Sequence, residues 1–124
     1  MVQSVRYHAR DVRPAAGVNL HDRALAEKVG GAYGLACRTC HGAPGIKPDP
    51  WGYLYPPAPD LTRADVVGTW SDAELYWMIK NGIEHTGMIG LGPRRTRKRK
   101  NRAIERNDSR DLFDCCLSIL RRGK

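Results

Sequence analysis

The chain has 124 residues and a formal net charge of +8, which suits one small domain and leaves no room for a second. The charge is uneven: residues 1–93 hold nine Lys or Arg and nine Asp or Glu, whereas residues 94–124 hold twelve basic and four acidic side chains. No stretch approaches the ~18 apolar residues of a membrane-spanning helix, and the first residues do not resemble a signal peptide. We therefore expect no signal or anchor in the chain as written, and an anion-binding role only for the last quarter.

Residues 1–21 show neither a helical nor a strand period, and they contain Pro14 and Gly17. We therefore expect an extended arm over this stretch. Because such an arm has no continuous apolar face, it should add little to a core, and its histidines, His8 and His21, should be solvated.

A helical period begins at Asp22. Apolar side chains at spacings of three and four residues share one face of the predicted helix, namely Leu25, Val29, Ala32, Tyr33, Ala36 and Cys40. Gly30, Gly31 and Gly34 each weaken such a helix by up to ~1 kcal/mol relative to alanine. Glycine in a helix is useful where another backbone approaches closely, so we expect a close contact at these positions.

Six of the eight prolines lie in residues 44–59. This density excludes a central strand or a long helix there and predicts a long loop. Loops of this length in a compact domain are usually functional.

A capping box formed by Ser71 and Glu74 predicts a helix over residues 72–81, and Gly82 suits the position after its end. The inward stripe consists of Leu75, Met78 and Ile79, with Tyr76 and Trp77 at its margins. No convincing strand or internal repeat is present. Since two short helices bury too little apolar surface to fold alone, we expect another group to fill the centre.

Residues 37–41 read Cys-Arg-Thr-Cys-His, the attachment signature of a c-type haem. Two cysteines three residues apart at a helix end can each add to a vinyl group on one porphyrin edge. The adjacent histidine can then turn its imidazole under the iron. The motif therefore predicts one covalently attached haem c, anchored by Cys37 and Cys40 and ligated by His41.

Other interpretations of this motif are a redox-active Cys-x-x-Cys, half of a zinc site, or chance. A thioredoxin-like motif would need a βαβ setting, which is absent. A structural zinc site would need a second ligand pair at a suitable spacing, and the adjacent Cys115 and Cys116 do not offer one.

The sixth iron ligand has two candidates, Met88 and His85, in the glycine-rich loop after the second predicted helix. An isolated methionine usually fills a core, as expected for Met78 on its apolar stripe. Met88 fits no stripe, which favours it as a ligand, whereas His85 is otherwise an exposed loop histidine. His/Met ligation raises the reduction potential and leaves no open site, so it favours electron transfer.

These motifs together resemble small class I cytochromes c of the bacterial respiratory type, over about residues 4–88. The resemblance rests on Gly30-x-x-Tyr33-x-x-x-Cys37-x-x-Cys40-His41-Gly42-Ala43-Pro44-Gly45, Pro56-Pro57-Ala58-Pro59-Asp60-Leu61, Trp70-Ser71-x-x-Glu74-Leu75-x-Trp77-x-Ile79-Lys80-Asn81-Gly82-Ile83 and Thr86-Gly87-Met88. It implies an all-α, cytochrome c-like fold of short helices and long loops around a covalent haem. It also implies Cys37 and Cys40 as thioether anchors, and His41 and Met88 as axial ligands.

The resemblance further implies a one-electron carrier rather than an enzyme, with redox proteins as partners and a place in the periplasm or in a periplasm-facing membrane complex. It implies that a carbonyl within residues 57–59 accepts the hydrogen bond from Nδ1 of His41. Tyr53, Tyr55 and Trp77 are candidates for lining the haem pocket, although packing elsewhere is an equal alternative for each.

Both ends of the chain depart from the family. Its members carry an export signal or a membrane anchor before the haem domain, so we expect the chain to be an N-terminally shortened reading frame. The family has a proline after the ligand methionine, where this chain has Ile89. The family's closing helix is therefore expected to be atypical or missing.

The expected organisation is an extended arm over residues 1–21, a haem domain over 22–93 and a basic tail over 94–124. The tail is expected to be disordered or frameshifted. Residues 90–98 and 114–118, re-translated in other frames, can encode sequences similar to the family's own continuation.

Two further hypotheses remain, and the first of them rests on the basic tail. One is a nucleic-acid- or membrane-binding protein in which the cysteine motif is incidental or binds a metal. Phe113 is the only aromatic residue of the tail and lies outside its basic run, so partners for base stacking are absent and we expect no nucleic acid. The other is a haem sensor in which Met88 is not held and the sixth site is open.

Overall fold

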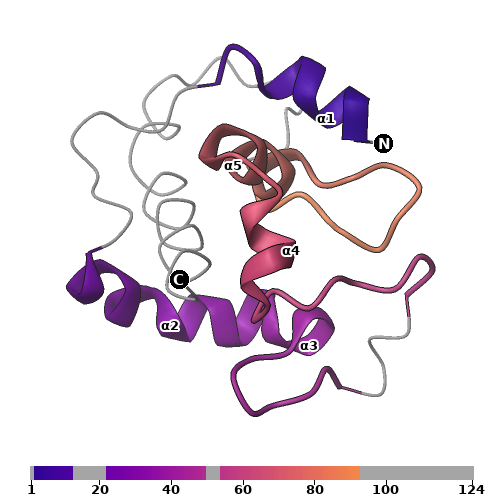
Figure 1. Cartoon of the computed structure of the whole chain (residues 1–124). Coiled ribbons are helices and arrows are strands. Elements are labelled where there is room, and N and C mark those ends of the chain that lie inside the picture. The colour runs from indigo at the N-terminus through magenta and orange to yellow at the C-terminus, as the bar shows by residue number, and fades with distance from the viewer. Residues whose placement is uncertain (1, 13–21, 50–53, 93–124) are drawn as a thin grey trace, which may run out of the picture.

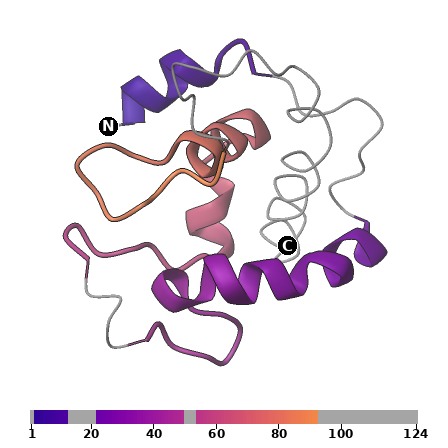
Figure 2. The ribbon, with the colours of Figure 1, turned by 180° about the vertical axis from the view of Figure 1, so that it is seen from behind.

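The computed structural model describes residues 2–12, 22–49 and 54–92, and these residues form helices but no strand. The helices are α1 (Val2–Ala9), α2 (Arg23–Ala36), α3 (Arg38–His41), α4 (Ala64–Gly68) and α5 (Asp72–Asn81). The expected helical class is confirmed for this part of the chain as a small, mostly helical structure. In Figure 1, α2 and α3 lie at the bottom and α1 lies beside α5 at the top. Helix α4 lies between these two levels. The view from behind in Figure 2 shows the same arrangement.

Several expectations concern residues outside the described ranges. They are the disordered or frameshifted tail, the solvation of His21, and the placement of Tyr53. None of the helices in the described ranges has the length and apolar character needed to cross a membrane.

The prediction of an extended arm is wrong for the first part of residues 1–21, because Val2–Ala9 forms helix α1. Val5 and Ala9 lie one turn apart and are each only 2% exposed, since this face packs against α5. A two-turn helix offers too few apolar positions to show a period, and it owes its stability to tertiary packing. His8 is exposed, but it is not merely solvated, because its ring stacks on the Trp77 indole. The ring centroids are 5.4 Å apart and the angle between the ring planes is 12°.

Helix α2 begins where the sequence predicts. Asp22 is its N-cap, and the carboxylate accepts a hydrogen bond from the amide of Ala24 at 2.9 Å. The helix ends at Ala36, and Cys37 separates it from α3. Tyr33 is buried as expected, but Ala36 is exposed, because the apolar face does not continue straight through this break.

The expected close contact at the glycines of α2 is not made by the described residues. A Cβ added to Gly30, Gly31 or Gly34 would meet no atom of these residues within 4 Å.

Helix α5 has the predicted bounds and the predicted start. The hydroxyl of Ser71 accepts a hydrogen bond from the amide of Glu74 at 3.3 Å, and the Glu74 carboxylate accepts one from the Ser71 amide at 2.7 Å. Gly82 follows the helix with a φ of +73°. A Cβ at this glycine would lie 2.6 Å from the carbonyl oxygen of Met88. Glycine is therefore required both by the backbone angle and by the close approach of the next loop.

A hydrophobic core cluster of the described residues lies between α2, α4 and α5. It consists of Tyr33, Val67, Leu75 and Ile79. Partly buried side chains pack against it, among them Cys37, Trp70, Met78 and Met88. Helix α4, which lies just beyond the prolines of the long loop and was not predicted, contributes Val67.

Candidate functional site

The cysteine–histidine motif forms a tight turn at the junction of α2 and α3. The amide of Cys37 donates to the carbonyl of Tyr33 at 2.9 Å, which continues the hydrogen bonding of α2. The carbonyl of Cys37 then accepts from the amides of Cys40 at 3.2 Å and His41 at 2.9 Å. Residues three apart on a helical turn lie on the same side, so this backbone places the two cysteines on one side of the turn. Both are half-buried, and neither is in a disulfide with another described residue.

The ring of His41 is fixed by the long loop. Its Nδ1 lies 2.8 Å from the carbonyl oxygen of Pro59, so the hydrogen bond that the resemblance implies is present. Because a carbonyl oxygen can only accept, Nδ1 carries the proton. The lone pair of the neutral ring is then on Nε2, which is the atom that can ligate a metal.

A second set of contacts holds the turn after His41. Gly42 has a φ of +70°, and a Cβ there would lie 2.8 Å from the carbonyl oxygen of Ile46. The hydroxyl of Tyr33 donates to the carbonyl of Gly42 at 2.8 Å in a buried position. Ala43 and Ile46 exchange two backbone hydrogen bonds. Helix α2 and the turn therefore behave as one unit that fixes the position of His41.

The loop after α5 holds Met88 through its own hydrogen bonds. The hydroxyl of Thr86 donates to the carbonyl of Ile83 at 2.7 Å and accepts from the amide of Met88 at 3.1 Å. The amide of Ile83 donates to the carbonyl of Met88 at 3.0 Å. Met88 is half-buried against the same core cluster as Cys37. His85 is exposed and has a φ of +60°.

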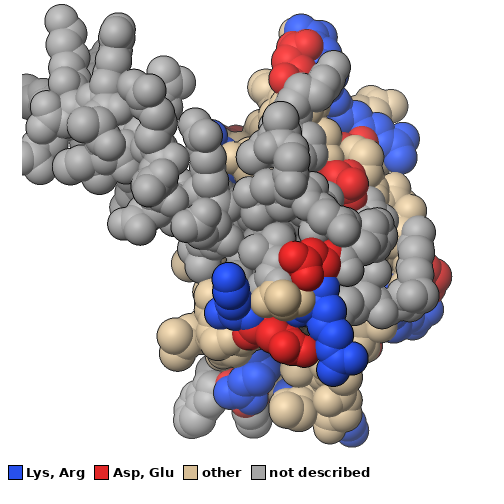
Figure 3. Space-filling model, turned by 90° about the vertical axis from the view of Figure 1, so that its left-hand side faces the viewer, with Lys and Arg blue, Asp and Glu red and all other residues tan. Residues whose placement is uncertain are grey.

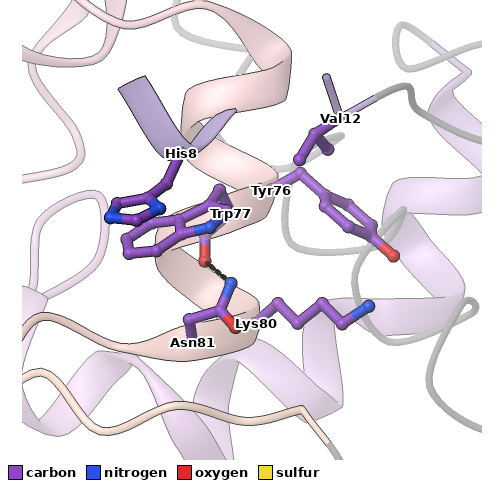
Figure 4. Close-up of a pocket in the computed structure, with 6 residues that line it drawn as sticks. All are labelled: His8, Val12, Tyr76, Trp77, Lys80 and Asn81. Carbon is purple, nitrogen blue, oxygen red and sulfur yellow. Dashed lines mark hydrogen bonds between the residues drawn. The ribbon is translucent and has the colours of Figure 1, made fainter. Parts of the chain in front are cut away.

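Of the aromatic residues considered for a haem pocket, the structure describes Tyr55 and Trp77. Tyr55 is 94% exposed. Trp77 lies against α1 and lines an open hollow of about 400 Å³ between α1 and α5 (Figure 4). The hollow is lined by His8, Val12, Tyr76, Trp77, Lys80 and Asn81. It includes none of the predicted cysteine, histidine or methionine ligands, so it is separate from the candidate site.

The loop that supplies Pro59 carries an ordered carboxylate. Asp60 accepts hydrogen bonds from the Thr62 hydroxyl at 2.6 Å and the Thr62 amide at 2.9 Å. These two bonds lower the pKa of Asp60 below its ordinary value of 3.8, and the bond from the hydroxyl has the larger effect. Nearby, the Arg63 guanidinium donates hydrogen bonds to the carboxylate of Asp65. These bonds lower the pKa of Asp65 below its ordinary value. Figure 3 shows Lys and Arg interspersed with Asp and Glu on one face, with neither sign dominant.

A zinc site is not assembled within the part of the chain that the structure describes, where no three His, Cys, Asp or Glu side chains gather into a possible metal site. No family model matches the chain, and the searches of curated proteins and of solved structures likewise return no similar protein.

Proposed function

We propose that the chain is a monohaem c-type electron carrier. In this proposal Cys37 and Cys40 hold haem c through thioethers, and His41 and Met88 ligate the iron. The observation that carries it is the 2.8 Å hydrogen bond between Nδ1 of His41 and the carbonyl of Pro59. A histidine whose Nδ1 is held by a backbone carbonyl presents Nε2 in a fixed direction, as metal-ligating histidines do.

The donor set fits haem better than the other cofactors considered. Two cysteines on one helical turn suit thioether attachment, and an imidazole with a thioether sulfur is the axial pair of high-potential haem proteins. Met88 is supported over His85 as the second ligand, because Met88 is half-buried and packs against the same cluster as Cys37. The side chain of His85 is exposed to solvent instead.

The chain's own residues have a limited set of tasks in this function. Bound haem would supply reversible one-electron chemistry. Pro59 keeps the proton on Nδ1 of His41, Tyr33 ties α2 to the turn after His41, and Thr86 holds the backbone of Met88. Electron transfer requires neither a general acid nor a general base. The partners are then redox proteins, either free or in a membrane complex, and the compartment is the periplasm, as the resemblance implies.

Expression of the whole chain behind an export signal, together with the haem c attachment machinery, tests the proposal. We expect one haem that stays bound after denaturation, a reversible one-electron redox titration, and the long-wavelength absorption band of methionine-ligated ferric haem. Cys37→Ala/Cys40→Ala should lose the covalent haem. Arg38→Ala and Thr39→Ala, which alter the two residues between the cysteines, are the matched controls and should retain it.

Two other results would favour the alternatives. Covalent haem without methionine ligation and with ready CO binding would indicate a haem sensor with an open sixth site. Failure to attach haem, combined with tight, salt-sensitive binding to polyanions, would overturn the proposal and favour a nucleic-acid- or membrane-binding protein.

A further inference from the structure

Helix α1 is attached to α5 by three kinds of contact. Val5 and Ala9 are buried, with 2% exposure each. The His8 ring lies face to face with the Trp77 indole at 5.4 Å (Figure 4). The guanidinium Nε of Arg6 lies 3.4 Å from Oε1 of Glu74. α1 therefore contacts both the first turn and the middle of α5.

Glu74 links α1 to the start of α5. One carboxylate oxygen, Oε2, accepts from the Ser71 amide within the capping box, while the other, Oε1, faces Arg6. The side chain of Glu74 is 14% exposed and that of Arg6 is 57% exposed. Because Glu74 is largely shielded from solvent, this ion pair is screened less than a fully exposed one.

The far end of α5 holds both ends of the Met88 loop. The amide of Leu91 donates to the carbonyl of Ile79, and the amide of Gly92 to that of Lys80, each at 2.9 Å. The chain leaving α5 is held as well, since the Gly82 amide donates to the carbonyl of Met78 at 2.8 Å. In Figures 1 and 2 this loop, in orange, leaves α5 and returns to it. A displacement of α5 would therefore displace Met88.

We propose that α1 is a positioning element for Met88, acting through α5. Arg6 and His8 hold α5 from its outer side, and the last turn of α5 holds the loop in which Met88 lies. The inference rests on the proposed function, in which Met88 is the second iron ligand. Arg6 and His8 touch no ligand, so they are positioning residues.

The test compares Arg6→Ala/His8→Ala with Gln3→Ala in the whole haem-loaded chain. Gln3 is exposed on the same helix and serves as the matched control. We expect the double variant to raise the affinity of the ferrous form for CO by about threefold to tenfold, the range for losing an aromatic stack and a half-exposed ion pair. Hydrogen exchange of the Ile83, Leu91 and Gly92 amides should accelerate by a similar factor.

The readouts separate positioning from a purely structural role. A structural role alone would lower the melting temperature of the double variant and leave CO affinity and the methionine band unchanged. That result, with exchange at the three amides equal to that of Gln3→Ala, would overturn the inference. A wild-type chain that binds no haem would overturn the proposed function itself, so the two failures are distinguishable.

Discussion

At the scale of single residues, a backbone carbonyl decides which nitrogen of His41 carries the proton. Pro59 is eighteen residues away in sequence, and its carbonyl oxygen lies 2.8 Å from Nδ1. The contact needs the long loop to return to the end of α3, and Gly42 makes the turn after His41 possible.

Gly42→Ala should disturb this site. The new Cβ would lie 2.8 Å from the carbonyl oxygen of Ile46 and would sit on a backbone with a φ of +70°. We expect the free energy of unfolding to fall by about 1–3 kcal/mol, measured by chemical denaturation. Gly45→Ala, at a φ of +75° but with no atom within 4 Å, is the control. It should show only the backbone penalty, and an equal loss in both variants would contradict the role of the close contact.

Thr62→Val should raise the pKa of Asp60 toward its ordinary value, because Thr62 donates the hydroxyl bond that lowers it most. Since the folded-state pKa of Asp60 is depressed, its stabilising contribution is present above the unfolded value of 3.8 and is lost as the pH falls through the folded pKa. A carbon-detected NMR titration of the carboxyl group measures the change. An unchanged pKa in Thr62→Val would rule out the hydroxyl as the main cause.

At the scale of elements, the start of α5 is determined by hydrogen bonds among neighbouring residues, whereas α1 depends on packing against another helix. The capping box places the start of α5 at the position that residues 71–74 predict. The sequence of α1 contains no comparable capping motif. Its two buried residues, Val5 and Ala9, are buried because the helix packs against α5. This difference explains why one helix was predicted and the other was not.

Ser71→Ala should destabilise the protein by about 1 kcal/mol, the usual cost of losing an N-cap side chain. The loss should be seen as a lower melting temperature. Ser71→Asp, which restores an acceptor at the N-cap, should recover most of the difference. A Ser71→Ala variant as stable as the wild type would contradict the role of the capping box in stability.

At the scale of the whole molecule, the described parts of α2, α4 and α5 share one core cluster. Its four clustered members, Tyr33, Val67, Leu75 and Ile79, are surrounded by side chains that are only partly buried. Leu35 and Ile89 are 89% and 70% exposed. In the proposed function, a covalently held apolar cofactor would bury further apolar surface of these helices.

On the proposed function, the chain without haem should therefore unfold less cooperatively than the chain with haem. We expect the Cys37→Ala/Cys40→Ala variant to have a smaller denaturant m-value and a weaker near-ultraviolet circular dichroism signal than the haem-loaded wild type. A sharp transition of full amplitude without haem would show that the centre is filled by protein alone.

The sequence by itself determined what depends on neighbouring residues: the helical class, the start of α2 at Asp22, the bounds of α5 and the spacing of Cys37, Cys40 and His41. These features follow from caps and turns within a few residues, whose energetics are local. The bond from His41 to residues 57–59 was expected only through the resemblance to a family.

Tertiary structure alone decided that residues 2–9 are helical, that His8 stacks on Trp77, and that Ala36 is exposed beside the break at Cys37. Each of these depends on which distant segment packs against the residue. Apolar burial is not directional, so a short sequence pattern does not specify its partner. Only the packed chain determines which surface covers which.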